Sequence, residues 1–149
     1  MVGTEKNATD VTNAAALSRS ILTPKGWSWQ EKHGFVQGRV LSPDSRTIYI
    51  AGQASVDDKG NPINKGNIEA QFVQALTNLE AVVAEAGGTL ANVVKVTYFT
   101  TDIDRFFQCE KVLVKHLLDH NCYPTSTLVG VKSLFHPDIL FEVEAIAVV

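Results

Sequence analysis

Apolar residues recur with helical spacing in the middle of the chain, from Ile68 to about Ala86. They fall every three or four residues, at Phe72, Ala75, Leu76, Leu79, Val82, Val83 and Ala86. Asn67 precedes the pattern and can cap a helix by accepting a backbone N–H. Gly87 and Gly88 follow it and suit a helix end. This pattern predicts an amphipathic helix from Ile68 to about Ala86.

A second helical pattern follows Asp104, which we expect to be the N-cap, and runs to about Asp119. Its apolar positions are Phe106, Cys109, Leu113 and Leu117, widened by Phe107, Val114 and Leu118. Apolar positions three and four apart lie on one side of a helix. The pattern therefore predicts a helix that packs one face against the rest of the molecule.

Five apolar or alternating runs predict strands at residues 35–41, 47–52, 92–101, 126–131 and 139–148. Pro43 and Asp44 suit a loop between the first two runs, which we therefore expect to form a hairpin. The order strand, strand, helix, strand, helix, strand, strand predicts an α+β fold with a mixed sheet.

The strands are apolar on both faces, yet two helices can cover only one face of such a sheet. The other face must be buried in some other way, because a large exposed apolar surface is unusual on a monomer. Self-association is the simplest solution. The alternative is a twisted sheet that folds over itself.

Composition favours one domain, over residues 23–149, preceded by an N-terminal arm at residues 1–22. The chain has 149 residues and 45% hydrophobic content, enough for one core. The net charge of -3 and the lack of a basic run argue against a nucleic-acid partner. No apolar run could span a membrane or serve as a signal peptide, so we expect a cytoplasmic protein. Cys109 and Cys122 are expected to be free thiols.

Glu142 and Glu144 lie two apart in the last predicted strand and so share a face with apolar neighbours. A charge in such surroundings requires a partner, a water-filled pocket or a raised pKa. The alternatives are a functional carboxylate and one that faces solvent or pairs across a subunit contact. For Glu144 we favour the second alternative, and for Glu142 both stay open.

Other side chains have simpler explanations than a functional site. His116 and His120 are four apart and could hold zinc, but the dipole at a helix C-terminus also favours histidine there. Ser126 lacks the surroundings of a nucleophile. Trp27 and Trp29 are candidates for a pocket lid, although packing of the arm is the explanation we prefer. His33 and His136 are predicted to be loop residues.

Several short sequence motifs resemble those of the reactive intermediate deaminase (Rid, YjgF-like) family over about residues 33–149. They are Gly34-Phe35-Val36-Gln37-Gly38, Ile50-Ala51-Gly52-Gln53, Ile68-Glu69-Ala70-Gln71, Ala75-Leu76-Thr77-Asn78-Leu79, Val93-Val94-Lys95-Val96, Pro124-Thr125-Ser126-Thr127 and Glu142-Val143-Glu144-Ala145-Ile146-Ala147. The resemblance implies a chorismate-mutase-like α+β fold with two helices on one face of the sheet. It also implies a homotrimer, with a cleft for a small-molecule ligand at each subunit boundary.

The resemblance further implies hydrolysis of an enamine or imine to a carbonyl compound and ammonia, without metal or organic cofactor. By the same resemblance Glu142 would orient or deprotonate the attacking water. Gly52 would let its backbone approach the ligand, and the backbone carbonyl of Leu128 would complete the pocket. Ala51 replaces a frequent Ser.

Three positions depart from the family pattern. Ser126 stands where deaminating members have an Arg that clamps the substrate carboxylate, Glu110 where they have Asn, and Phe35 where they have Tyr. A neutral hydroxyl cannot replace the charge-assisted hydrogen bonds of an Arg. Candidate replacements for that cation are Arg39, Arg105 and Lys132.

Two functions therefore remain open. The first is a Rid-like hydrolytic deaminase, of the 2-iminobutanoate/2-iminopropanoate type, with an altered substrate. The alternative is a non-catalytic trimer that binds a small molecule or has a regulatory role. The ribonuclease or translation-inhibitor function sometimes claimed for the family lacks a basic surface here.

Overall fold

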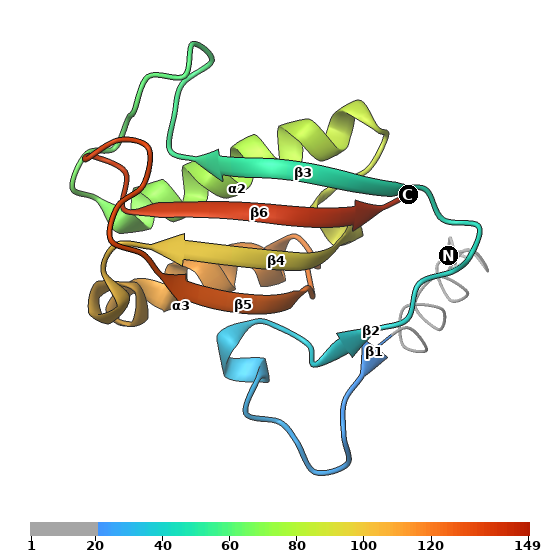
Figure 1. The fold of residues 1–149 in the computed structure, drawn as a ribbon. Coiled ribbons are helices and arrows are strands. Elements are labelled where there is room, and N and C mark those ends of the chain that lie inside the picture. Colours follow the sequence, from blue (N-terminus) through green and yellow to red (C-terminus); the bar gives the residue numbers. More distant parts are fainter. Residues whose placement is uncertain (1–20) are drawn as a thin grey trace, which may run out of the picture.

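The computed structural model describes residues 21–149 of the chain, so the predicted arm lies outside the described residues except for its last two. The core is one mixed sheet with two helices (Figure 1). The elements in chain order are β1 (Ile21–Leu22), a 3-10 turn (Glu31–His33), β2 (Gly38–Arg39), β3 (Thr47–Ala54), α2 (Ile68–Glu85), a 3-10 turn (Leu90–Asn92), β4 (Val93–Thr100), α3 (Ile103–Asp119), β5 (Thr125–Gly130) and β6 (Phe141–Val148).

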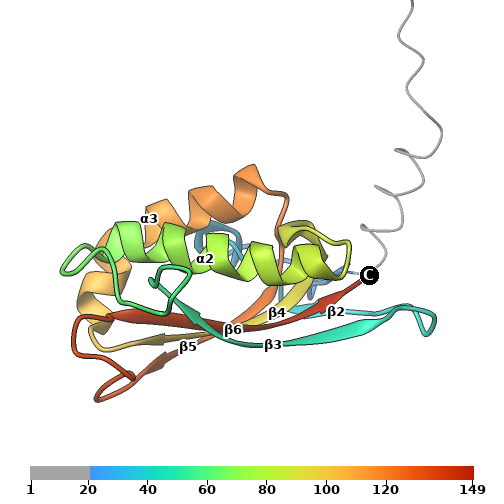
Figure 2. The same ribbon diagram turned by 90° about the horizontal axis from the view of Figure 1, so that it is seen from above.

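The main sheet has the strand order β3-β6-β4-β5. The strand β6 is antiparallel to both of its neighbours, whereas β4 and β5 are parallel. Parallel neighbours need a long crossover connection, which α3 provides. Both helices pack on the same face of the sheet (Figure 2). The predicted α+β class, with a mixed sheet and two helices on one face, is confirmed.

The helix α2 begins where the sequence predicts. The Asn67 side chain accepts a hydrogen bond from the Ala70 backbone N–H at 3.0 Å. The predicted cap of α3 is wrong, because the Asp102 side chain, and not that of Asp104, accepts the Arg105 N–H at 3.0 Å. Asp104 instead lies in the first turn, where the helix dipole still favours an acidic residue.

Alternate residues of the strands form the core beneath the helices. In β6 the odd-numbered residues from Phe141 to Ala147 are buried, and the even-numbered ones face the other side. Phe72 of α2 packs edge-on against Phe141 and Phe106, with ring centroids 4.7 and 5.3 Å apart. This packing fixes which face of each strand meets the helices.

The predicted hairpin of residues 35–41 and 47–52 is wrong. Only Gly38–Arg39 of the first run form a strand, which pairs with Ile21–Leu22 and not with β3. Residues ahead of it run along the start of β5, where the Val36 N–H donates to the Pro124 carbonyl at 2.9 Å. A strand pattern does not identify its partner, and here the partners lie far away in the sequence.

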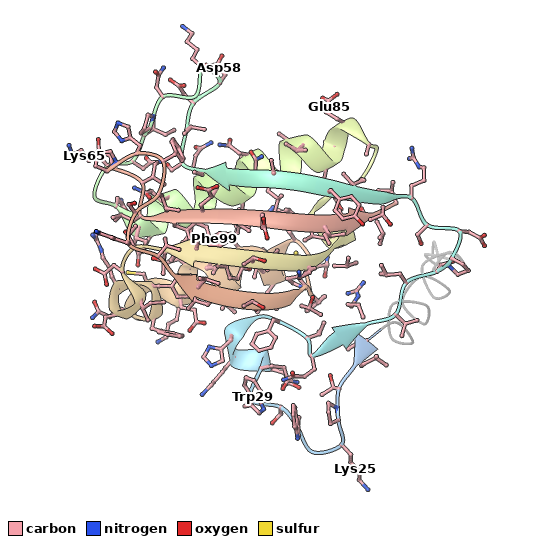
Figure 3. All side chains as sticks on the ribbon, viewed as in Figure 1. Lys25, Trp29, Asp58, Lys65, Glu85 and Phe99 are labelled. Carbon is pink, nitrogen blue, oxygen red and sulfur yellow. The ribbon has the colours of Figure 1, made fainter. Side chains whose placement is uncertain are left out.

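No helix among residues 21–149 covers the second face of the sheet (Figure 2). We call it the open face; it presents Tyr49, Lys95, Thr97, Phe99, Glu142, Glu144 and Ile146. Tyr49 is 80% exposed there. Figure 3 views this face and labels Phe99 over the middle strands. None of the helices in residues 21–149 is long and apolar enough to cross a bilayer.

Candidate functional site

The six residues expected to form the site lie in two groups on opposite faces of the sheet. Phe35, Glu110, Ser126 and Leu128 line one pocket of about 250 Å³. Ser126 and Leu128 pair in register with Val96 and Tyr98, whose side chains are buried on the helix side. Gly52 and Glu142 lie together on the open face. The two groups therefore do not share a cavity in this structure.

We call the pocket on the helix side the aromatic pocket. It is lined by Trp29, His33, Phe35, Tyr98, Phe106, Phe107, Glu110, Leu113, Ser126 and Leu128. Trp29 lies in the segment next to β5 (Figure 3) and meets the Phe35 ring edge-on at 5.6 Å between centroids. Trp27 packs on Trp29 at 6.2 Å and is not among the lining residues. Only Trp29 of the two thus forms part of the wall.

His33 and Glu110 form a polar pair in this pocket. His33 Nδ1 lies 2.8 Å from Glu110 Oε1, and both side chains are mostly buried, with 28% and 16% exposed. His33 was expected in a loop, but it ends a 3-10 turn that holds it against α3. Sequence reasoning missed the pair because its members are 77 residues apart. No local pattern connects them.

Tyr98 supplies a second polar group to the pocket. It is 4% exposed, and within the described residues its hydroxyl has no hydrogen-bond partner. Burial first, then the nearby Cys122 and Glu110, raises the pKa of this phenol well above its ordinary value. The hydroxyl therefore stays protonated and can both donate and accept a hydrogen bond. The strand pattern had marked Tyr98 only as an alternating position.

On the open face, the Glu142 carboxylate closes over the backbone of Gly52. A Cβ atom at residue 52 would lie 2.8 Å from Glu142 Cδ and closer still to Oε1. The pairing of β3 with β6 shifts register here, between Ile50 and Gln53. This irregularity and the missing side chain of Gly52 leave the space that the carboxylate occupies.

Glu142 is held in an environment that disfavours its charge. Burial is the main cause that raises its pKa above the ordinary value, and the neighbouring Glu144 is the second. Among residues 21–149 no side chain or backbone group forms a hydrogen bond or ion pair with this carboxylate. A half-buried carboxylate of this kind can take up and release a proton closer to neutral pH.

The proposed substitutes for the missing cation lie elsewhere. The Arg39 guanidinium donates to the Tyr123 carbonyl at 3.1 Å, and Arg105 donates to the Gly66 carbonyl. Neither of them, nor Lys132, lines the aromatic pocket. A separate hollow of about 290 Å³ on the open face is lined by Lys95 and Glu144 among others. Among the described residues, no Lys or Arg thus lines the aromatic pocket.

The histidine pair near the end of α3 has a structural explanation. The rings of His116 and His120 stack with centroids 4.3 Å apart, and His120 Nδ1 donates to the His116 carbonyl at 2.7 Å. Over the described part of the chain no three His, Cys, Asp or Glu side chains gather as metal ligands would. Cys109 and Cys122 are free thiols, and burial raises the pKa of Cys122 to about 12.

Comparison with known proteins assigns the family. The family model described as Endoribonuclease L-PSP matches residues 30–149. A RutC family protein of Pyrococcus horikoshii is 36% identical over 100 residues, which cover 67% of this chain and 77% of that protein. A 2-iminobutanoate/2-iminopropanoate deaminase of Salmonella typhimurium is 32% identical over 115 residues, 76% of this chain and 86% of that protein.

A solved structure of a Rid family protein from Yersinia pestis, described as of unknown function, has the same fold. The TM-score is 0.74 at 25% identity, with 87% of this chain and 97% of that chain covered. The family model spans most of the described sheet and both helices. The chain therefore belongs to the YjgF-like Rid family.

Proposed function

We propose that the protein is a hydrolytic deaminase that converts a small enamine or imine to the carbonyl compound and ammonia, with Glu142 as general base. The unpaired Glu142 carboxylate, held against Gly52 with a raised pKa, is the observation that carries the proposal. Family membership supports the same class of reaction, because relatives such as the Salmonella protein are named as imine deaminases.

The chemistry needs one group that first accepts and then returns a proton. An enamine is first protonated on carbon to give the imine. The imine nitrogen takes a proton from solvent to give the iminium ion. Water then adds to the C=N carbon: its oxygen forms the new bond, Glu142 takes a water proton, and the π electrons become the nitrogen lone pair of a neutral amino alcohol. When the C–N bond breaks, Glu142 returns its proton to the leaving nitrogen, the hydroxyl oxygen forms the C=O bond, and the hydroxyl proton goes to solvent, which leaves the carbonyl compound and ammonia. A raised pKa suits both steps because catalysis is best when the pKa approaches the working pH.

We further propose that the active unit is a homotrimer. The open face carries Tyr49, Phe99 and Ile146 beside Glu142, a surface that contact with another copy would shield from water. The strand β5 is at the edge of the sheet and contributes Ser126 and Leu128 to the aromatic pocket. In the proposed assembly the pocket of one copy and the Glu142 of a neighbour meet at the subunit boundary.

The test is ammonia release from a panel of enamines and imines generated in solution. We expect Glu142→Gln to lower kcat by about 100-fold or more, the usual contribution of a general base. Glu144→Gln is the matched control, because it removes a carboxylate two residues along the same strand face. Equal rates for wild type and Glu142→Gln would refute the catalytic assignment.

A second candidate function is ligand binding without turnover. It is favoured by the absence of Lys and Arg among the described residues that line the aromatic pocket, since an anionic substrate would lack the countercharge of such a side chain there. A ligand that raises Tm progressively as its concentration increases, with no product formed by wild type, would support this function over catalysis.

A further inference from the structure

We propose that the aromatic pocket binds a small organic cation, an ammonium or iminium group attached to a single ring or short apolar body, through Glu110. The pocket is the one of about 250 Å³ next to α3. The claim that this cation is the substrate rests on the proposed deaminase function. The claim that the pocket binds a cation does not depend on that function.

The charge of the pocket disfavours an anionic ligand. Its titratable lining groups are His33, Tyr98 and Glu110. Tyr98 stays neutral, and His33 is paired with the Glu110 carboxylate at 2.8 Å. Among the described lining residues there is no Lys or Arg. A ligand carboxylate therefore meets no free cationic side chain in this wall, whereas a ligand cation meets Glu110.

Unused hydrogen-bond capacity matches the donors of an ammonium group. His33 engages only Oε1 of Glu110, and Oε2 has no partner within residues 21–149. The buried Tyr98 hydroxyl in the same pocket also lacks a partner there. Buried polar atoms in native proteins are nearly always satisfied, so the unpartnered Tyr98 hydroxyl indicates a ligand group beside it, in the pocket that Glu110 also lines.

The remaining walls suit a cation with an apolar body. Trp29 and Phe35 form one aromatic pair, and Phe106 and Phe107 form another, with ring centroids 5.6 and 5.7 Å apart. Aromatic faces attract ammonium groups and pack against ligand rings. The volume is at the small end for ligand pockets, which limits the occupant to about one ring.

Three probes of one shape and different charge test the proposal. Benzylamine is a cation at neutral pH, benzyl alcohol is neutral, and benzoate is an anion. Isothermal titration of the full chain should give a Kd for benzylamine about tenfold lower than that for benzoate. Benzoate affinity equal to or above that of benzylamine overturns the proposal, as does the absence of binding by all three probes.

Variants identify the residue responsible. Glu110→Gln should weaken benzylamine binding about tenfold and leave benzyl alcohol binding unchanged, which also reports that the pocket is intact. Glu85→Gln, at the exposed end of α2, is the charge-matched control and should change neither. Ser126→Arg adds a cation to the wall and should reverse the preference toward benzoate. An unchanged benzylamine affinity in Glu110→Gln overturns the proposal.

The two proposals fail separately. Loss of ammonia release in every assay, with the benzylamine preference intact, overturns the deaminase function and leaves the cation site standing. Turnover that depends on Glu142, together with a pocket that prefers benzoate, overturns the cation site alone.

Discussion

Two carboxylates on opposite faces of one sheet differ in how the protein treats them. Glu110 pairs with His33 at 2.8 Å beside aromatic rings. Glu142 lies over Gly52 without a partner among the described residues, and burial raises its pKa. In our proposals the first holds a ligand group, and the second exchanges a proton. Single substitutions at Glu110 and at Glu142 therefore test the two proposed roles separately.

Glu142 should make folding stability depend on pH. Because its pKa is higher in the folded than in the unfolded state, the folded protein binds more protons between those two values, and stability falls as pH rises through that window. Glu142→Gln removes this titration. We therefore expect its Tm relative to wild type to be higher at pH 7.5 than at pH 4, measured by calorimetry.

Glu85→Gln removes the same charge from an exposed position at the end of α2 and serves as the control. Its Tm difference from wild type should change less between the two pH values. If the Tm of Glu142→Gln relative to wild type were the same at both pH values, or higher at pH 4 than at pH 7.5, the assignment of a raised pKa would be contradicted.

Gly52→Ala should damage activity more than stability. The added Cβ would overlap the end of the Glu142 side chain, which can rotate away at little cost to the fold. We expect a loss of at least about tenfold in kcat, because a displaced base loses its position, with a change in unfolding free energy below about 1 kcal/mol. In a double-mutant cycle, the substitution should have no further effect on kcat in Glu142→Gln. If the effects of the two substitutions on kcat were fully additive, Gly52 would not act by positioning the Glu142 carboxylate.

At the scale of the element, Gln71 ties α2 to the segment that enters β6. Its side chain is fully buried, donates to the carbonyls of Asn64 and Asp138, and accepts the Leu140 N–H at 2.8 Å. These bonds satisfy backbone groups that no strand or helix pairs. The helix thereby fixes where β6 begins, at Phe141, one residue before Glu142.

Gln71→Leu should lower the unfolding free energy by about 3 kcal/mol, because it keeps the volume but leaves buried backbone groups unpaired. Gln74→Leu is the same substitution one turn along, where the side chain donates only to Asn78 at 2.9 Å, and should cost below about 1 kcal/mol. Urea unfolding of both variants gives the comparison. Equal costs would show that the buried bonds of Gln71 are not what stabilises this junction.

Helix and strand boundaries were predictable where they depend on neighbouring residues and unpredictable where they depend on residues far away in the sequence. The start of α2 was predictable because Asn67 and the apolar spacing after it are local. The cap of α3 was not, because Asp102 and Asp104 are both good caps, and the choice depends on where β4 ends. Residues 35–41 carried a strand pattern, but their partners are Ile21–Leu22 and the region of Pro124, which no local pattern identifies.

At the scale of the whole molecule, the sequence and its family resemblance placed Phe35, Glu110, Ser126 and Leu128 in one site, and these four do share a pocket. His33 and Tyr98 were missed because only the tertiary fold brings them to that pocket. The separation of Glu142 from it, on the other face of the sheet, was equally invisible. Strand alternation shows which residues share a face but not which face the helices cover.

The proposed trimer predicts the behaviour of the open face. Sedimentation should give a particle of three times the 16.2 kDa chain mass. Tyr49→Asp, which places a charge at an 80% exposed aromatic on that face, should dissociate it. Val82→Asp on α2 puts the same charge on the helix layer and should leave the assembly intact. A monomeric wild type, or dissociation by both variants, would contradict this arrangement.

The position of β6 has a consequence for synthesis on the ribosome. This strand follows every other described element along the chain, yet it lies between β3 and β4. A nascent chain that ends after β5 can join β4 to β5, but β3 has no neighbour and its hydrogen-bonding edge is bare. Such edges recruit strands from other chains. Stalled translation before residue 141 should therefore yield aggregates, and chaperone demand should be greatest just before β6 emerges.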